Sequence, residues 1–313
     1  MNKIKTKISR ETNYIYHMLS VAKCGYDNEY GNKYLSLHLP EDLSLLKSNE
    51  FLITVKGAEH CGELYYWLVS VPASLDTEAT LFYESLHYLF TTGNVIEYLK
   101  RYESLLKLFL PTNDPNFIDS AHEFYNHYSK FDAIVPICEV MIRNYPIYCA
   151  KAWKECEREI LPYAKSVEST FNQNGLSKKL EDITGESQET EFIATFCNSL
   201  NGGAEAIDIS VNQHVFRIGS SHEWVVDFIS HEYIIYLLKH ALAGTSAFKE
   251  LVKYWLYIEG LAEFYLSLTG KRSGFSECQH VIDFYNELYQ GNNTLTAPEL
   301  YNKAIDKFAI PKE

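Results

Sequence analysis

The sequence lacks the features that mark disulfide-rich, nucleic-acid-binding and phosphate-cradling proteins. Its seven cysteines are an odd number without a C-x-x-C pair, so neither a disulfide framework nor a thiolate zinc site is encoded. Lys and Arg number 28 against 41 Asp and Glu, and the resulting net charge of −13 repels phosphate backbones and anionic lipids. No glycine-rich phosphate motif is present. We therefore expect no nucleic-acid partner and a cytoplasmic protein.

The sequence also lacks a long uncharged apolar run. The basic start of the chain has the charge of a secretion signal, but residues 13–17 interrupt the apolar stretch that such a signal needs. The most apolar window, residues 225–244, contains Asp227, Glu232 and Lys239, which is too much charge for a helix facing lipid. We expect no membrane association and interpret this window as a buried helix.

The residues that are abundant predict an α+β fold that is mainly α. Hydrophobic residues make up 46% and charged residues 22% of the 313 positions, as in globular proteins. Helical spacing of apolar residues prevails up to about residue 171, and a polar stretch then precedes β-branched and aromatic segments at 192–200 and 206–218. The sequence therefore predicts a helical N-terminal domain over residues 1–185 and a second domain with a small edge sheet over residues 186–313.

Two helices of the second domain each place one polar residue on an inward apolar face. His231 lies on the face shared by Trp224, Phe228, Ile235, Leu238 and Leu242. Glu259 lies at the centre of the equivalent face of the next helix, and a buried carboxylate needs a cation, a metal or a hydrogen-bond donor. We therefore expect His231 and Glu259 to lie within hydrogen-bond or one-water distance, with Glu263 partly buried and directed at the same place.

This segment resembles the gluzincin class of zinc metallopeptidases, which carry H-E-x-x-H on one helix and a glutamate ligand on the next. The resemblance covers residues 192–268 and rests on His231-Glu232 and on E-G-L-A-E from Glu259 to Glu263. It implies that His231 is the first zinc ligand and Glu259 the third. It also implies that Glu232 is the general base acting on the metal-bound water and that Glu263 steadies a ligand.

The sequence departs from the gluzincin pattern at Ile235, where the second histidine ligand would stand. A catalytic zinc has three protein ligands and a water, so two ligands predict weak zinc binding or none. The expected function is that of a degenerate metallopeptidase homologue, a pseudo-peptidase that binds peptide or protein in the former active-site cleft. One alternative is an active zinc peptidase that recruits a remote ligand such as His222 or His280. The other is a helical scaffold protein with a buried His-Glu pair.

A second histidine pair forms an H-E-x-x-x-H sequence at His122, Glu123 and His127. It resembles the variant motif of dipeptidyl-peptidase-like zinc enzymes. No strand segment precedes it, and the acidic residues that follow are typical of a solvated helix surface. We therefore favour the site at His231.

Overall fold

The protein is a mainly helical α+β protein, as the sequence predicts. The computed structural model describes residues 3–54, 64–75, 79–107, 116–201, 207–210, 212–219, 221–246, 254–275 and 277–308. The chain divides into two compact units, both discontinuous in sequence. Unit 1 comprises residues 1–7, 162–194 and 211–313, and unit 2 comprises residues 8–161 and 195–210.

Four short strands form one sheet, with neighbours in the order β1-β2-β4-β3. The strands are β1 (Ile4–Lys7), β2 (Phe192–Cys197), β3 (Ile207–Ser210) and β4 (Gln213–Arg217). Strand β2 is rich in aromatic and β-branched residues and buried at all but one position, which is typical of an interior strand. The strands predicted from residues 192–200 and 206–218 are confirmed by β2, β3 and β4.

Unit 2 contains most of the N-terminal helices. They are α1 (Arg10–Val21), α2 (Glu29–Tyr34), the 3-10 turns η1 (Leu35–Leu37) and η2 (Glu50–Leu52), α3 (Pro40–Ser48), the π-helical η3 (Tyr66–Ser70), α5 (Val71–Ser74), α6 (Ala79–Thr92), α7 (Val95–Leu106), α8 (Phe117–Tyr128) and α9 (Ile134–Lys151). Helix α1 is buried from Glu11 to Val21 and contacts α2, α3, α5 and α9, so it forms the centre of this unit. The long α10 (Trp153–Asn174) begins in unit 2 and ends in unit 1.

A chain of buried hydrogen bonds crosses the interior of unit 2. Nε2 of His17 lies 2.8 Å from Nε2 of His38, and Nδ1 of His38 lies 2.7 Å from Oδ1 of Asn144. The Asn144 amide in turn donates to Asp42, at 2.8 Å. Burial lowers the pKa of both His17 and His38. Because an amide oxygen only accepts, His38 donates from Nδ1 to Asn144 and accepts at Nε2 from Nε2 of His17. The two imidazoles are therefore both neutral, and each donates one hydrogen bond in the same direction along the chain of contacts.

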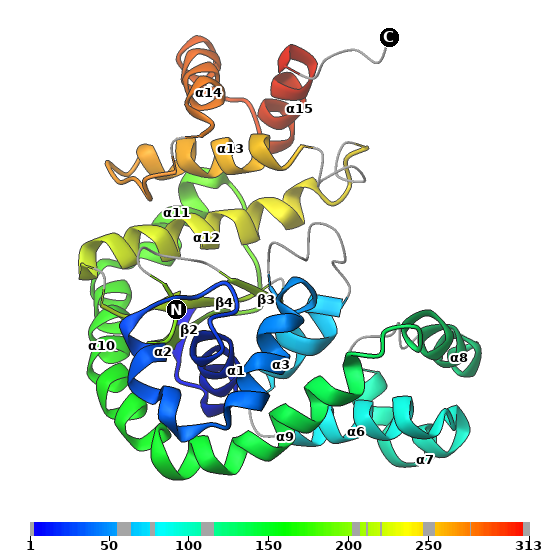
Figure 1. Cartoon of the computed structure of the whole chain (residues 1–313). Coiled ribbons are helices and arrows are strands. Elements are labelled where there is room, and N and C mark those ends of the chain that lie inside the picture. Colours follow the sequence, from blue (N-terminus) through cyan, green and yellow to red (C-terminus); the bar gives the residue numbers. More distant parts are fainter. Residues whose placement is uncertain are drawn as a thin grey trace. The chain divides into compact units, whose positions relative to one another are not determined.

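Unit 1 carries the remaining helices. They are α11 (Leu176–Thr184), α12 (His222–Leu242), α13 (Trp255–Ser267), α14 (Gln279–Gly291) and α15 (Ala297–Phe308). Figure 1 shows α12 and α13 running side by side, and α13 also contacts α14 and α15. Helices α13 and α14 approach closely at Gly260, where an added Cβ would lie 2.9 Å from Cγ1 of Val281. This packing holds the predicted site between helices of a single unit.

The domain limits predicted from the sequence, 1–185 and 186–313, stay a prediction. In the structure, the C-terminal part of α10, all of α11 and strand β1 belong to the same compact unit as the C-terminal helices. Residues 1–7 join unit 1 because β1 pairs with β2, as when the Phe192 amide donates to the carbonyl of Lys3 at 2.8 Å. Such a long-range pairing cannot be read from local composition.

Candidate functional site

Helix α12 presents His231 to α13 from a fully enclosed position. The helix starts at Ser221, whose side chain accepts a hydrogen bond from the Trp224 amide at 3.2 Å, and Lys239 and His240 lie in its last turn. Between Val225 and Leu242 nearly every side chain is buried, so α12 is covered all around rather than on one stripe. This enclosure leaves its polar side chains dependent on partners within the protein.

His231 lies between two carboxylates of α13. Its Nε2 donates to Oε2 of Glu259 at 2.9 Å, and its Nδ1 lies 2.8 Å from Oε1 of Glu263. The Nδ1 contact is an ion pair whose N–H direction does not meet the angle of a hydrogen bond. The ring stacks on Phe228, with centroids 6.1 Å apart and planes at 4°. The expected His231–Glu259 contact is therefore confirmed, and so is the burial of Glu263 against the same imidazole.

These contacts favour the imidazolium form of His231. Burial lowers the pKa of His231, but the contacts with Glu259 and Glu263 outweigh burial and raise the pKa to about 10. Burial raises the pKa of Glu263, and its contacts with His231 and Ser273 outweigh that effect, so the pKa is lowered overall. Ser273 donates both its hydroxyl and its amide to Oε1 of Glu263, the amide at 3.3 Å. The cluster of His231, Glu259 and Glu263 is thus a buried, charged, hydrogen-bonded group.

The other two residues of the predicted site face elsewhere. Glu232 is directed at His214 of β4, with Oε2 lying 3.1 Å from Nδ1 of His214. Consecutive helix residues differ by about 100° in direction, so α12 sends His231 to α13 and Glu232 to the sheet. Ile235, which stands where the gluzincin pattern would require a second ligand, is 1% exposed. The structure therefore brings His231, Glu259 and Glu263 into contact, whereas Glu232 acts on His231 only through its charge, which helps to raise the pKa of the imidazole.

The described residues offer a zinc ion fewer than three ligands at this position. Nε2 of His231 and Oε2 of Glu259 are hydrogen-bonded at 2.9 Å, whereas a tetrahedral zinc separates a nitrogen and an oxygen ligand by about 3.4 Å, so a zinc ion would have to replace this hydrogen bond. A ligating imidazole must also lose its proton, which costs about 4 kcal/mol at pH 7 for a pKa of about 10. Among the described residues, no group of three His, Cys, Asp or Glu side chains is arranged to hold a metal ion.

The histidines considered as remote ligands lie in other settings. His222 lies at the start of α12, with Nε2 3.2 Å from the hydroxyl of Ser166 in α10. The exposed ring of His280 packs edge-on against Phe308, with centroids 5.2 Å apart. His122 and His127 are both exposed on α8, in unit 2. None of these side chains is in contact with His231 or Glu259 in the described part of the chain.

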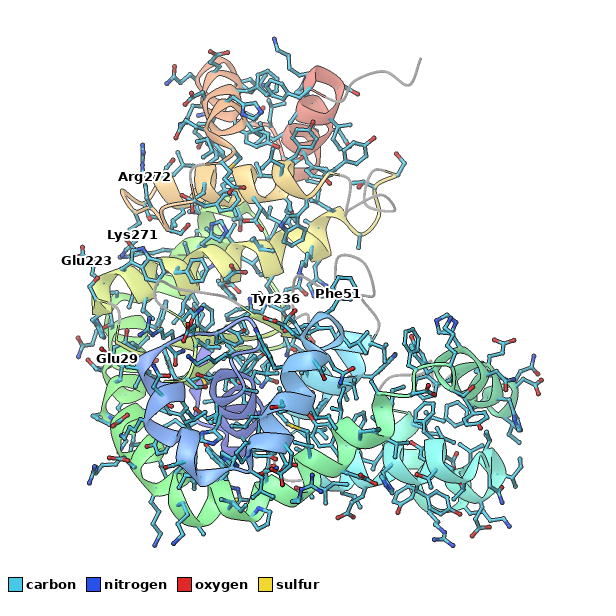
Figure 2. The ribbon with its side chains drawn as sticks, viewed as in Figure 1. Glu29, Phe51, Glu223, Tyr236, Lys271 and Arg272 are labelled. Carbon is cyan, nitrogen blue, oxygen red and sulfur yellow. The ribbon has the colours of Figure 1, made fainter. Side chains whose placement is uncertain are left out.

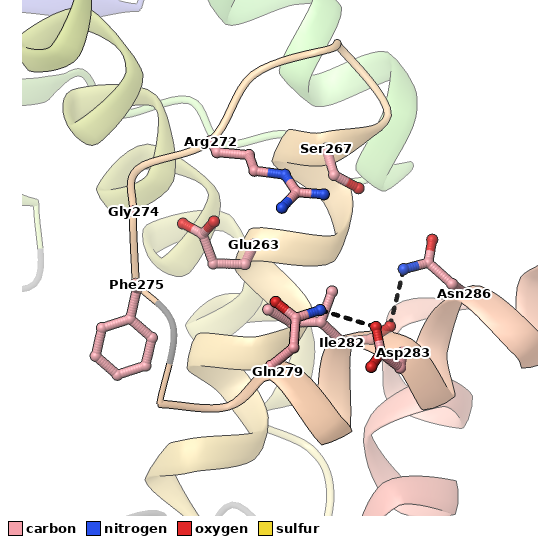
Figure 3. A pocket seen from close by; sticks show the side chains of 9 residues that line it. All are labelled: Glu263, Ser267, Arg272, Gly274, Phe275, Gln279, Ile282, Asp283 and Asn286. Atoms are coloured by element: carbon pink, nitrogen blue, oxygen red, sulfur yellow. Dashed lines mark hydrogen bonds between the residues drawn. The ribbon is translucent and has the colours of Figure 1, made fainter.

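A small cavity opens beside Glu263, between α13, α14 and the connection that joins them. Its volume is about 130 Å³. Figure 3 shows the Arg272 guanidinium and the Glu263 carboxylate facing this space, with Gln279 and Asp283 on the α14 side. Lys271, the neighbour of Arg272 in the chain (Figure 2), instead forms an ion pair with Asp227 of α12. Within the described residues Arg272 makes no ion pair or hydrogen bond, so its charge is available at the cavity.

The sequence interpretation did not identify His214, Ser273 or Arg272. His214 stands in a short strand whose first four residues are all buried, and its contact with Glu232 depends on how α12 packs on the sheet. Ser273 and Arg272 lie in an irregular connection whose path has no periodic signature. The one sequence feature that indicates a tightly turning connection is the pair of glycines, Gly270 and Gly274, which both adopt positive φ next to these polar residues.

Comparison with known proteins does not assign a family: no protein-family model, curated protein or solved structure matches this chain. Among the helices that the structure describes, none combines the length and the apolar character needed to cross a membrane.

Proposed function

We propose that this protein is a degenerate metallopeptidase homologue that has lost zinc-dependent hydrolysis and serves as a peptide- or protein-binding domain. The proposal joins the resemblance of residues 192–268 to gluzincins with the geometry of the His231 cluster. One observation carries it: both nitrogens of His231 are engaged by carboxylates, at 2.9 Å and 2.8 Å. A histidine held in this way has no lone pair to offer a metal.

The position of Ile235 supports the same proposal. Isoleucine is apolar and branched, and at 1% exposure it adds bulk where a gluzincin places an imidazole. Glu232, which would be the general base, lies against His214, with Oε2 3.1 Å from Nδ1, instead of facing Glu259. A zinc-bound water would have neither its metal nor its base in this arrangement.

The cavity beside Glu263 supports a retained binding role. It combines an exposed guanidinium with polar side chains of α14 and with the Phe275 ring. Guanidinium groups recognise carboxylates in a bidentate manner, so Arg272 is the group that would receive a carboxylate of a peptide or protein. Glu263 and Asp283 line the same cavity, so such a carboxylate must approach Arg272 from the side away from them.

Zinc calorimetry on the full chain tests the loss of the metal site. We expect the wild type to carry no stoichiometric zinc after purification without added metal and to bind zinc weakly. Ile235→His should raise zinc affinity by orders of magnitude, because two imidazoles one turn apart would then face Glu259. The double variant Ile235→His with Glu259→Ala should lose that gain.

Ile234→His is the matched control, because Ile234 is equally buried but points to another side of α12. It should not raise zinc affinity, and circular dichroism checks that each variant is folded. Tight stoichiometric zinc in the wild type, together with peptidase activity that a chelator abolishes, would refute the proposal. Equal zinc affinity of the two histidine variants would show that α12 and α13 do not present a former metal site.

A further inference from the structure

A second and larger cavity lies in unit 1, where three helices end. Its volume is about 620 Å³, within the range of about 300–1,000 Å³ typical of small-molecule sites. The C-terminal ends of α11 and α13 and Tyr289 in the last turn of α14 line it, together with Asn293, Leu295 and Thr296. It does not include His231, Glu259 or Glu263, so it is independent of the cluster described above.

The convergence of helix C-termini gives this cavity a negative potential. The last carbonyls of a helix carry the negative end of its dipole, and a Lys, Arg or His in the last turn often offsets it. Helices α11, α13 and α14 have no basic residue in their last turns. The amides that follow each helix satisfy part of these carbonyls, as when the Gly270 amide donates to Ser267 at 2.9 Å. The helix dipoles, with no basic side chain to offset them, still favour a positively charged occupant.

Glu186 adds a full negative charge at the cavity wall. It follows the left-handed Gly185 that ends α11, and its side chain is half-buried. Within the described residues the Glu186 carboxylate forms no hydrogen bond or ion pair, and partial burial raises its pKa. Neighbouring Asp182, by contrast, is already paired with Lys178 at 2.6 Å. Glu186 is therefore a partly desolvated carboxylate that has no cationic partner among the described residues.

Aromatic and aliphatic side chains complete the wall. Tyr265 of α13 and Tyr289 of α14 line the cavity together with Leu268 and Leu295. Glu186 and Tyr265 line the same cavity, so the carboxylate and the phenol share one environment. Aromatic rings attract ammonium groups over their faces, and the leucines suit a short hydrocarbon chain.

We infer that this cavity binds an organic cation, a primary ammonium group on a short aliphatic chain, with Glu186 as its counter-ion. Two sources share this chemistry: a free alkylamine and a lysine side chain of a peptide. The inference does not depend on the proposed loss of zinc hydrolysis, because no residue of the His231 cluster takes part in it.

Titration calorimetry on the full chain at constant ionic strength tests the inference with defined probes. We expect n-butylammonium and Nα-acetyl-lysine methylamide to bind, and the neutral analogue 1-pentanol to bind at least about tenfold more weakly. Tighter binding of the lysine derivative would identify a peptide side chain as the natural occupant, and tighter binding of butylammonium a free amine. Absence of binding by both ammonium probes would refute the inference, as would equal binding of 1-pentanol.

Glu186→Gln is the decisive variant and Glu189→Gln its matched control. Both remove one negative charge within the same connection, but Glu189 is exposed and does not line the cavity. We expect Glu186→Gln to weaken ammonium binding about tenfold or more and Glu189→Gln to leave it within about twofold. Equal affinities of the two variants would mean that only the net charge of the protein attracts the cation. Tyr289→Leu should also weaken binding, since it keeps apolar contact but removes the ring.

Discussion

The pH dependence of folding stability tests whether His231 is charged in the folded protein. A pKa raised above the value in the unfolded chain means that the folded state holds the proton more tightly. The stabilisation from His231 is therefore complete below pH 6.5 and is lost as the pH rises through about 10. At about 1.4 kcal/mol per pH unit, this interval corresponds to at most about 5 kcal/mol of unfolding free energy.

Glu263 of the same cluster contributes a pH dependence of stability opposite to that of His231. The pKa of Glu263 is lowered in the folded state, so its contribution is present above the ordinary value of 4.5 and is lost as the pH falls below it. The contact between His231 and Glu263 appears in both shifts, and the two contributions are therefore not added. The cluster as a whole stabilises the fold most between about pH 4.5 and 6.5.

Urea unfolding followed by circular dichroism between pH 6 and pH 10 measures this effect. The comparison protein carries His231→Gln, Glu259→Gln and Glu263→Gln together, because removing the imidazole alone would leave two unpaired buried carboxylates. The two proteins share every other titrating group, so the difference between their curves isolates the cluster. We expect that difference to decrease by about 1.4 kcal/mol per pH unit above pH 6.5.

Parallel curves for the two proteins would refute the reasoning, because they would mean that His231 is neutral throughout this range. Titration of the wild type by nitrogen NMR of labelled histidine provides a measurement that does not depend on the folding of the variant. An imidazole that loses its proton near pH 6.5 would also remove the main objection to a metal-binding role for His231.

Two further predictions concern packing and buried polar contacts. Gly260→Ala should lower the free energy of unfolding by about 1–3 kcal/mol in urea, because the new Cβ would meet buried Val281 at 2.9 Å. This loss should outweigh the better helix propensity of alanine. Gly291→Ala is the control: its new Cβ would meet nothing within 4 Å, so the change should be neutral or slightly stabilising. A similar loss in both variants would point to a backbone effect. Asn144→Leu should destabilise by about 1–3 kcal/mol, because it leaves His38 and Asp42 without the amide that joins them, whereas Asn126→Leu at an exposed position should change stability little. If Asn144→Leu is as stable as the wild type, the buried chain of hydrogen bonds does not stabilise unit 2.

The helices of the site could be predicted from the sequence because apolar spacing is a local property. The predicted buried helix over residues 225–244 corresponds to α12, His222–Leu242. One apolar face of α12 predicts that His231 points inward, but α12 is buried on all sides, so this face does not indicate which neighbouring element His231 contacts. The contact with α13 is predictable only because Glu259, a second enclosed polar residue, needs a partner on a neighbouring helix.

Contacts that depend on strand register or loop path could not be predicted. The pairing of Glu232 with His214 requires that β4 lie against the side of α12 next to His231, which no local pattern encodes. The hydrogen bonds from Ser273 to Glu263 require the connection after α13 to turn back on that helix. The membership of residues 1–7 in unit 1 has the same origin, since it depends on the pairing of β1 with β2.

The raised pKa of His231 and the isoleucine at position 235 have one electrostatic explanation under the proposed descent. In a gluzincin site, a doubly charged metal offsets the charge of the glutamate ligand and of nearby acidic groups. With Ile235 in place of a ligand, Glu259 and Glu263 remain as two buried carboxylates that need a cation. His231 meets that need by keeping its proton, with one ring nitrogen against each carboxylate. Zinc and the proton therefore compete for the same imidazole, and the zinc affinity of Ile235→His should increase as the pH approaches 10. A zinc affinity that does not change with pH in this variant would show that His231 is not one of the ligands.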